Sequence, residues 1–280
     1  MSELLSLVKA GGKPVIGMVQ LGPLPGSSRY RGGAIDTILA EAMSEAAILA
    51  DNGVDVLMVQ NLGDLPVASR AAPAQIAWTT RVAADLRARF QRPVGLNLLE
   101  NDAEAMFAVA SAANVDFVRI KVYVGAMLTP FGVETGQAHA AIRARNACNA
   151  DKVAIFADVH DRTGVPLATG GFVEDAQFAV RLGGADGMVL TGKSYRQTME
   201  FIAEARKHVS GAPILIGGGV TAENFAEAAS AADGVIVSSS LKDSSNAFGR
   251  LVPGKVAAFM DEVRRARSQP GAKAKTGRIA

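Results

Sequence analysis

The chain has 280 residues, of which 49% are hydrophobic and 20% are charged, and its formal net charge is +2. This composition is typical of a soluble globular protein with a large core, and so small a net charge gives no reason to expect nucleic acid as a partner. No apolar run is long enough to span a bilayer, the N-terminus lacks a signal-peptide pattern, and the single Cys148 excludes an internal disulfide framework, so we expect a cytoplasmic protein.

Eight short apolar runs alternate with segments of helical periodicity along the chain. The runs have the length and composition of buried parallel strands. They lie at 14–21, 54–59, 93–99, 117–123, 153–159, 187–190, 213–216 and 235–237. The apolar spacing predicts helices at 34–52, 73–90, 102–113, 138–149, 173–182, 196–209, 221–231 and 253–267.

Strict strand–helix alternation indicates a parallel sheet, and eight units over about 250 residues indicate closure into a barrel. We therefore predict an α/β fold with a single (β/α)8 TIM barrel over residues 1–267 and a flexible basic tail at 268–280. A doubly wound open sheet is the alternative. It is disfavoured by the number of units and by the lack of G-x-G-x-x-G after the first strand.

The stretch 213–242 carries the clearest functional signal, because the last two predicted strands are followed by a glycine-rich and a serine-rich turn. Glycine lets a backbone approach an anion closely, and backbone N–H groups at such turns bind phosphate. In an eight-stranded barrel the loops after strands 7 and 8 are the usual phosphate site. We predict that Gly218, Gly219, Ser239 and Ser240 bind phosphate; a merely flexible turn is the alternative. Thr221 is the expected N-cap of the following helix.

Polar side chains of the fourth and fifth strands are expected to face the barrel interior. Side chains alternate across a strand, which directs Arg119, Lys121 and Tyr123 toward the axis, and likewise Asp158 and His160. An inward Arg cannot remain unpaired, so Asp158 is its candidate partner. A structural ion pair and a direct functional role both remain open for Arg119 and Asp158.

The catalytic candidates are Asp158, His160, Lys121 and Lys193. Asp158 and His160 form the strongest acid/base pair in the chain. Lys121 is a candidate for binding an anionic substrate or carrying a proton. Lys193 follows the sixth strand and is a candidate for a Schiff base, or else a loop lysine near the phosphate.

The sequence contains no established metal-binding motif and no hydrolase triad pattern. A divalent ion held by Asp158 and His160, together with Asn97 or Glu100, is the one alternative that their spacing allows. No other cofactor is indicated.

Further polar residues stand at the ends of other strands, where a barrel gathers its functional groups. The substrate-binding candidates there are Gln20, Asn61 (or its neighbour Gln60), Asn97, Arg119 and Thr191. Lys242, after the serine turn, is expected to be solvated. We expect a small phosphorylated molecule as the ligand and a homo-oligomer as the assembly.

Several motifs resemble the BtpA/SgcQ family. The first is GMVQLGPLPGSSRY at 17–30, which is quite specific. The others are DVLMVQNLGDLP (55–66), PVGLNLLENDAEA (93–105), DFVRIKVYVGAM (116–127), IFADVHDRTGVPL (155–167) and ADGMVLTG (185–192). The family is similar to the ribulose-phosphate-binding barrels. The resemblance implies either photosystem I biogenesis at thylakoid membranes or a part in carbohydrate or nucleoside utilisation.

The chain departs from the pattern of that family at several positions. Gln20, Gln60 and Glu100 stand where the family usually has His, Glu and Arg, and the Asp-Arg-Thr at 161–163 stands in place of Lys-His-Ala. Two acid/base or metal-binding groups are thereby lost. The substrate is therefore expected to differ from that of typical members.

The sequence predicts an enzyme that acts on a small phosphorylated sugar or nucleoside-type metabolite by the acid/base chemistry of an isomerase or a lyase. The alternative is a non-catalytic assembly or regulatory factor that retains a ligand pocket. The polar residues at the strand ends favour the enzyme, whereas the lost His and Glu favour the assembly factor.

Overall fold

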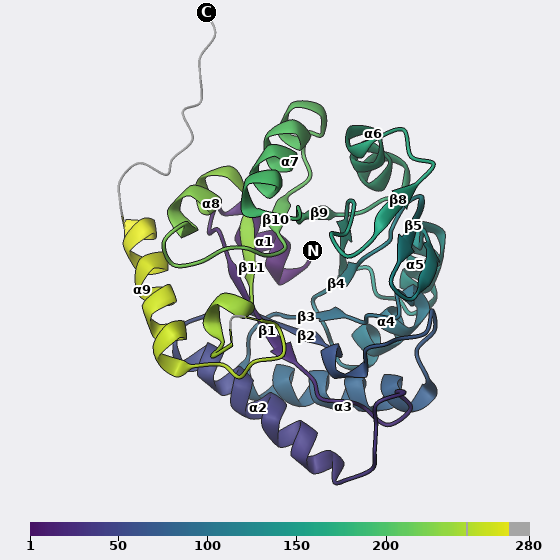
Figure 1. Cartoon of the computed structure of the whole chain (residues 1–280), viewed down its shortest axis with the longest axis vertical. Coiled ribbons are helices and arrows are strands. Elements are labelled where there is room, and N and C mark those ends of the chain that lie inside the picture. The colour runs from purple at the N-terminus through teal and green to yellow at the C-terminus, as the bar shows by residue number, and fades with distance from the viewer. Residues whose placement is uncertain (245, 269–280) are drawn as a thin grey trace, which may run out of the picture.

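The structure, a computed structural model, describes residues 1–244 and 246–268 and has a closed barrel of eight parallel strands at its centre (Figure 1). Around the barrel the strands follow the order β1-β11-β10-β9-β7-β4-β3-β2. Their bounds are β1 (Val15–Gln20), β2 (Val56–Gln60), β3 (Val94–Asn97), β4 (Phe117–Ile120), β7 (Ala154–Asp158), β9 (Gly187–Leu190), β10 (Ile214–Ile216) and β11 (Gly234–Val237). The predicted TIM barrel is confirmed, and the open sheet is excluded.

Helices connect consecutive barrel strands and cover the outside of the barrel (Figure 1). They are α2 (Ile35–Asp51), α3 (Pro73–Phe90), α4 (Ala103–Ala112), α5 (Ala138–Ala147), α6 (Phe172–Gln177), α7 (Tyr195–His208), α8 (Phe225–Ala231) and α9 (Pro253–Ser268). None of the helices within residues 1–244 and 246–268 is long and apolar enough to cross a membrane.

Two helix boundaries differ from the prediction. Helix α8 begins at Phe225, because the Asn224 side chain accepts the backbone N–H of Thr221 and closes a turn there; Thr221 is not the N-cap. At the C-terminus, α9 includes Ser268, the first residue of the predicted tail. The rest of that tail, 269–280, lies outside the described residues.

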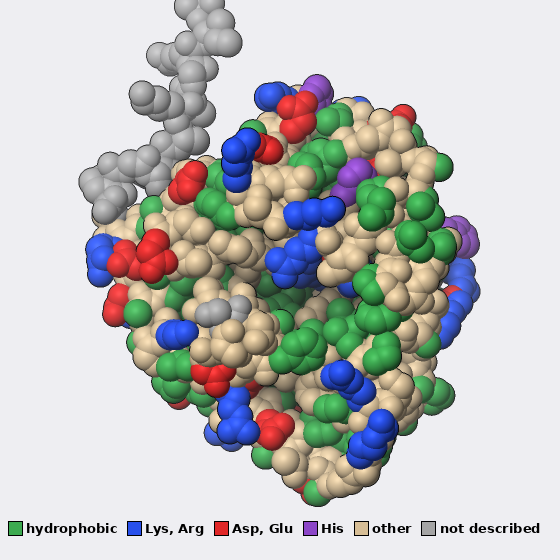
Figure 2. Space-filling model, in the orientation of Figure 1, with side chains coloured by type: hydrophobic (Ala, Val, Ile, Leu, Met, Phe, Trp, Pro, Cys, Tyr) green, Lys and Arg blue, Asp and Glu red, His purple; other side chains and the backbone are tan. Residues whose placement is uncertain are grey.

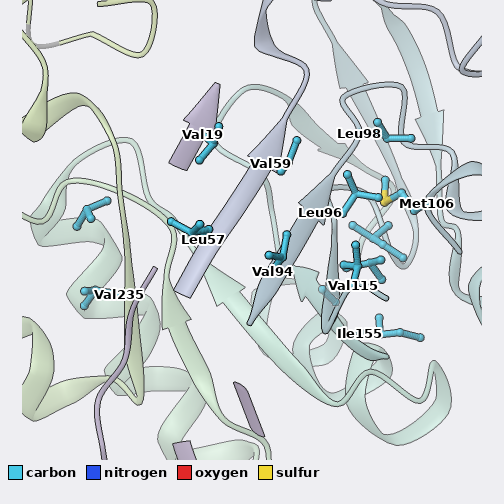
Figure 3. Packing of buried hydrophobic residues seen from close by; sticks show 14 of the residues in the cluster. Val19, Leu57, Val59, Val94, Leu96, Leu98, Met106, Val115, Ile155 and Val235 are labelled. Atoms are coloured by element: carbon cyan, nitrogen blue, oxygen red, sulfur yellow. The ribbon is translucent and has the colours of Figure 1, made fainter. Parts of the chain in front are cut away.

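Alternating side chains divide the core into an interior cluster and an outer cluster. Along β2, Val56 and Met58 face the barrel interior, whereas Leu57 and Val59 belong to the outer cluster beneath the helices. Figure 3 shows part of that outer cluster, with side chains from β1, β2 and β3 and from α4. The period of two expected for a parallel strand with both faces buried is thus observed.

A row of large and small residues fills the barrel interior. Gly95 of β3 lies opposite Phe117 of β4, and Phe156 of β7 lies opposite Gly187 of β9. The two phenyl rings meet edge to face with their centroids 5.7 Å apart. A Cβ on either glycine would clash with the facing ring. The two glycines therefore make the room that the two phenylalanines occupy.

A short N-terminal helix, α1 (Glu3–Lys9), closes the end of the barrel where the strands begin. Leu4 is fully buried in the interior cluster. The Asp116 carboxylate, just ahead of β4, accepts the backbone N–H groups of Glu3 (2.6 Å) and Leu4 (2.8 Å). A carboxylate at a helix N-terminus is favourable because it satisfies N–H groups that have no partner within the helix.

The two long loops after β4 and β7 are partly ordered as a second sheet. Strands β5 (Ala126–Thr129), β6 (Gly132–Thr135) and β8 (Val165–Leu167) pair antiparallel in the order β6-β5-β8. Met127 is buried on one side, while Leu128, Val133 and Val165 are exposed on the other. No strand was predicted between residues 123 and 138, so β5 and β6 were missed.

Replacing Leu4 by Ala should lower the free energy of unfolding by about 2 to 5 kcal/mol, the usual range for a fully buried leucine. The physical reason is the cavity left in the interior cluster where α1 closes the barrel. The control is Leu7→Ala on the same helix, because Leu7 is 37% exposed. Denaturant unfolding of the three proteins measures the effect, and equal losses for both variants would contradict a closing role for α1.

Candidate functional site

A cavity of about 570 Å³ opens at the end of the barrel where the strands finish. All eight barrel strands contribute to its lining, by their ends or by the segments that follow them, and the β5–β6 hairpin adds the rest. The hairpin contributes Met127, Thr129, Phe131 and Glu134, so the second sheet forms one wall. Figure 2, in the orientation of Figure 1, shows a hollow near the middle of this face with Lys and Arg side chains beside it.

The glycine-rich and serine-rich turns lie side by side in this cavity. Gly217, Gly218 and Gly219 follow β10, and Ser238, Ser239 and Ser240 follow β11. We call residues 217–219 and 238–240 the cup. Gly217 must lack a side chain because a Cβ there would clash with Thr191 Oγ1, and Gly219 has a φ of 82°. The cup has the position and backbone that phosphate sites of this fold use.

Unsatisfied polar atoms are concentrated in this cavity. Six side-chain oxygens in the described part of the chain are buried without a hydrogen-bond partner, and four of them belong to residues lining it. These four are Gln20 Oε1, Thr191 Oγ1, Ser238 Oγ and Ser240 Oγ. A buried polar atom without a partner costs free energy, so such a concentration indicates a place that a polar ligand completes.

A row of amide side chains forms another part of the lining. Backbone pairing puts Gln20 opposite Gln60, and Gln60 opposite Asn97. Gln60 Nε2 donates to Asn97 Oδ1, and Asn97 Nδ2 donates to the backbone oxygen of Arg119 at 2.8 Å. Neutral amides in a fixed row can recognise hydroxyl groups or a base edge but cannot transfer protons.

Arg119 and Asp158 form the expected buried ion pair between β4 and β7. Arg119 Nε lies 2.7 Å from Asp158 Oδ2, and Nη2 lies 2.7 Å from Oδ1. Arg119 lines the cavity, while Asp158 lies behind it. Both Asp158 oxygens are engaged, so this carboxylate positions the guanidinium.

Lys121 also lines the cavity, together with the loop that follows β7. Its Nζ lies 3.3 Å from Thr163 Oγ1 and 3.9 Å from Asp161 Oδ1. Asp161 Oδ1 accepts the Thr163 backbone N–H (2.8 Å) and its hydroxyl. A carboxylate and an ammonium group thus lie next to each other at the edge of the site.

His160 does not join Asp158 on the inward face, and that expectation is wrong. Strand β7 ends at Asp158 and His160 has a φ of 58°, so the strand alternation no longer directs its side chain. Its Nε2 lies 2.7 Å from Asp175 Oδ2 of α6, and its ring packs against Phe172. His160 lines a second cavity of about 220 Å³ beneath β8, which shares Lys121 with the first.

Other predicted residues also lie away from the main cavity. Tyr123, beyond the end of β4, belongs to the outer cluster and donates its hydroxyl to the Gly183 backbone oxygen. Lys193 is exposed at the start of α7 and does not line the cavity. Of the pair Gln60 and Asn61, Gln60 lines the site, because β2 continues through it, whereas Asn61 is buried elsewhere.

Lys242 is buried behind the cup, contrary to the expectation of a solvated lysine. Its Nζ donates to the Ala247 backbone oxygen (2.7 Å) and lies 4.0 Å from Glu45 Oε1. Glu45 Oε2 in turn accepts the Gln20 backbone N–H at 3.1 Å. Burial lowers the pKa of Lys242, and Glu45 opposes that shift. This chain of contacts fixes the serine turn against β1.

A buried acidic pair, Asp64 and Glu100, joins the loops after β2 and β3. Asn61 Nδ2 donates to Asp64 Oδ2 (2.9 Å) and to Glu100 Oε2 (2.8 Å), and Gln75 Nε2 donates to Asp64 Oδ2 and Glu100 Oε1, both at 2.7 Å. Burial raises the pKa of Glu100, and the hydrogen bond from Asn61 acts against it. The contacts of both carboxylates in the described residues include no cation.

The position of Glu100 bears on the metal alternative. Glu100 is engaged with Asn61 and Gln75, while Asp158 and His160 have separate partners. Over residues 1–244 and 246–268, no group of three or more His, Cys, Asp or Glu side chains could hold a metal ion. Asp158 and His160 both line the second cavity, but each side chain is bonded to a different partner there.

Besides Glu134 of the β5–β6 hairpin, two charged residues of the lining were not among the predicted site residues. They are Asp161 and Arg162, in the loop after β7. Their place directly after the fifth strand is the signal that could have identified them, because that is where barrel enzymes carry functional groups.

An eight-stranded parallel barrel with helices around it and a polar cavity at the strand ends defines a TIM-barrel protein. Within that class the chain belongs to the BtpA family, whose family model matches residues 11–265.

Two relatives illustrate the membership. The chain is 36% identical over 251 residues to the photosystem I biogenesis protein BtpA of Synechocystis sp., covering 89% of this chain and 87% of that protein. It is 37% identical over 183 residues to an uncharacterized protein of Thermococcus kodakarensis, covering 65% of this chain and 68% of that protein.

Solved structures share the fold at low sequence identity. Tryptophan synthase of Mycobacterium tuberculosis matches with a TM-score of 0.63 at 16% identity, covering 94% of this chain and 98% of that chain. N-(5'-phosphoribosyl)anthranilate isomerase of Pyrococcus furiosus matches with a TM-score of 0.54 at 14% identity, covering 90% and 98%. Both likenesses concern the fold.

Glu100→Gln should stabilise the protein increasingly as the pH rises. The folded chain holds the Glu100 proton more tightly than the unfolded chain does, so this contribution is complete below the unfolded pKa of about 4.3 and is lost as the pH rises toward the raised folded pKa. Glutamine keeps the neutral form at every pH. The expected gain is about 1.4 kcal/mol for each unit by which the folded pKa is raised.

Denaturant unfolding at pH 5 and pH 8 measures this gain, with Glu41→Gln on the exposed face of α2 as the control. A Glu100→Gln protein that loses stability relative to the wild type between pH 5 and pH 8 would show that the carboxylate is better accommodated charged.

Proposed function

We propose that the chain is an enzyme acting on a small phosphorylated sugar or nucleoside-type metabolite, by the acid/base chemistry of an isomerase or a lyase. The observation that carries this proposal is the concentration of unpaired buried oxygens around the cup, on Gln20, Thr191, Ser238 and Ser240. A ligand with phosphate oxygens and hydroxyl groups would satisfy them, since both groups accept or donate hydrogen bonds.

The residues divide into binding and reacting groups. Backbone N–H groups of the cup hold the phosphate, and the row of Gln20, Gln60 and Asn97 recognises hydroxyl groups. Arg119, held in position by Asp158, donates to an oxygen of the bound molecule. The cup end and the amide row together orient the substrate across the cavity.

Lys121 and Asp161 are the reacting pair in this proposal. The Asp161 carboxylate takes a proton from the carbon next to a carbonyl, and the Lys121 ammonium stabilises the negative charge that develops on the carbonyl oxygen. Returning this proton to the former carbonyl carbon completes an isomerisation, provided that the proton of the adjacent hydroxyl passes, by way of Lys121, to the former carbonyl oxygen. His160 is separated from this pair by its bond to Asp175, so it has no part in the transfer.

The second candidate is a non-catalytic assembly factor, and the name of the Synechocystis relative favours it. In that case the cavity would bind a ligand that regulates assembly, and the protein would not convert this ligand into a product. The two candidates differ in whether a bound compound is converted.

Ribose 5-phosphate should raise the melting temperature of the protein, whereas ribose should not. A ligand at 100 times its Kd stabilises by about 2.7 kcal/mol, and each kcal/mol shifts the melting temperature by about 2 to 4 °C in a protein of this size. Gly218→Val should melt like the wild type without ligand and show no shift, because its Cβ would meet Arg162 Nη1 (3.5 Å) and Thr191 Cγ2 (3.8 Å) at ordinary van der Waals distances yet would cover the cup.

Gly254→Val is the matched control, since no atom lies within 4 Å of a Cβ at that position. If ribose 5-phosphate raised the melting temperature of Gly218→Val as much as that of the wild type, the phosphate group would not bind at the cup. No shift by any sugar phosphate, nucleoside or nucleotide would favour the assembly factor.

Asp161→Asn should lower the turnover of a compound found in this way by about 10²- to 10⁴-fold while leaving its thermal shift intact, because an amide cannot accept the proton. Turnover is measured by the appearance of product under saturating compound. Asp151→Asn, an exposed residue ahead of β7, is the control. If Asp161→Asn turned over the compound as fast as the wild type, Asp161 would not be the group that takes the proton.

A further inference from the structure

The Arg162 guanidinium lies directly over the cup. Its Nη1 and Cζ are 3.5 Å and 3.9 Å from the position that a Cβ on Gly218 would take. Arg162 belongs to the loop between β7 and β8, whereas Gly218 follows β10, so two separate loops meet at this point. The arginine therefore lines the cavity beside the glycine-rich turn.

Arg162 differs from the other two cations of the lining because, in the described residues, no carboxylate lies within ion-pair distance of it, although Glu134 also lines the cavity. Arg119 is neutralised by Asp158 through two hydrogen bonds, and Lys121 lies 3.9 Å from Asp161. As far as the structure describes the chain, Arg162 makes no ion pair and its side chain makes no hydrogen bond. Its five N–H donors are therefore available to an anion.

The loop that carries Arg162 is held firmly on both sides. Asp161 Oδ1 accepts the Thr163 N–H at 2.8 Å, and the Asp161 backbone oxygen accepts the Gly164 N–H at 3.2 Å. From Val165 the chain continues as β8, which pairs with β5. The backbone at Arg162 is thus fixed close to the cup, so that only the side chain has to be ordered on binding.

We propose that Arg162 is the cationic wall of the cup and that it makes the site selective for a phosphate monoester dianion. This inference rests on the phosphate site proposed above. Backbone N–H groups on the inner side and a guanidinium fork on the outer side together satisfy three non-bridging oxygens. The fourth oxygen, which bears the ester, faces the amide row in the cavity. A phosphodiester has no outlet for its second substituent, because the guanidinium covers that side.

The test compares methyl phosphate with dimethyl phosphate as probes in thermal shift and isothermal calorimetry. The wild type should bind methyl phosphate and not dimethyl phosphate. Arg162→Ala should weaken methyl phosphate binding by about 10- to 100-fold, the range for losing a charge-assisted fork. Arg162→Lys should recover only part of this affinity, since an ammonium is a point charge without the fork.

Arg196→Ala is the control, because it removes the same charge from a side chain that is 90% exposed on α7. Arg162 is itself exposed at the rim, so both variants should melt like the wild type without ligand. Raising the salt concentration should weaken methyl phosphate binding more in the wild type than in Arg162→Ala.

The outcomes separate this inference from the proposed function. Methyl phosphate binding by the wild type together with undiminished binding by Arg162→Ala would overturn the role of Arg162 and leave the phosphate site standing. Equal binding of the diester by the wild type would overturn the selectivity. A wild type that binds neither methyl phosphate nor ribose 5-phosphate would overturn both proposals.

Discussion

The backbone register of the closed parallel barrel is the constraint on which the rest of this structure depends. Pairing puts Gln20, Gln60 and Asn97 in one row across three strands, and this row ends the apolar interior. Below it, Phe117 and Phe156 fill the space that two glycines leave. A guanidinium is tolerated at the level of the row because Asp158 on the neighbouring strand neutralises it. The apolar interior therefore determines where the polar site begins, and the loops only complete it.

Much of this arrangement could be predicted from the sequence, because strand alternation is a local property. The eight strands follow from short apolar runs, and the inward direction of Arg119 and its partner Asp158 follows from a period of two. The same period failed at His160 and Tyr123, which lie beyond the last residues of β7 and β4. Once a ladder ends, the alternation has no physical basis, and a positive φ at His160 redirects its side chain. Gln60 lines the site, and Asn61 does not, because β2 runs one residue further than the predicted strand.

The features that the prediction missed depend on contacts between distant segments. The segment 126–135 has a Pro-Phe-Gly turn between alternating residues, a hairpin signal, but its pairing with β8 joins two different loops. The burial of Lys242 depends on Glu45 in α2, and the closeness of Arg162 to Gly218 depends on two loops from opposite sides of β9. No local pattern in the sequence contains these distances. They arise only after the barrel has closed.

Helix α1 gives the order of synthesis a structural consequence. The bonds from Glu3 and Leu4 to Asp116 span 113 and 112 positions of the chain. During synthesis α1 thus has no docking place until the fourth barrel strand has followed it, and loop closure over such a span is slow. During that interval Leu4 lacks the interior cluster that buries it in the folded barrel. Helix α1 therefore reaches its native position only after segments that are synthesised long after it.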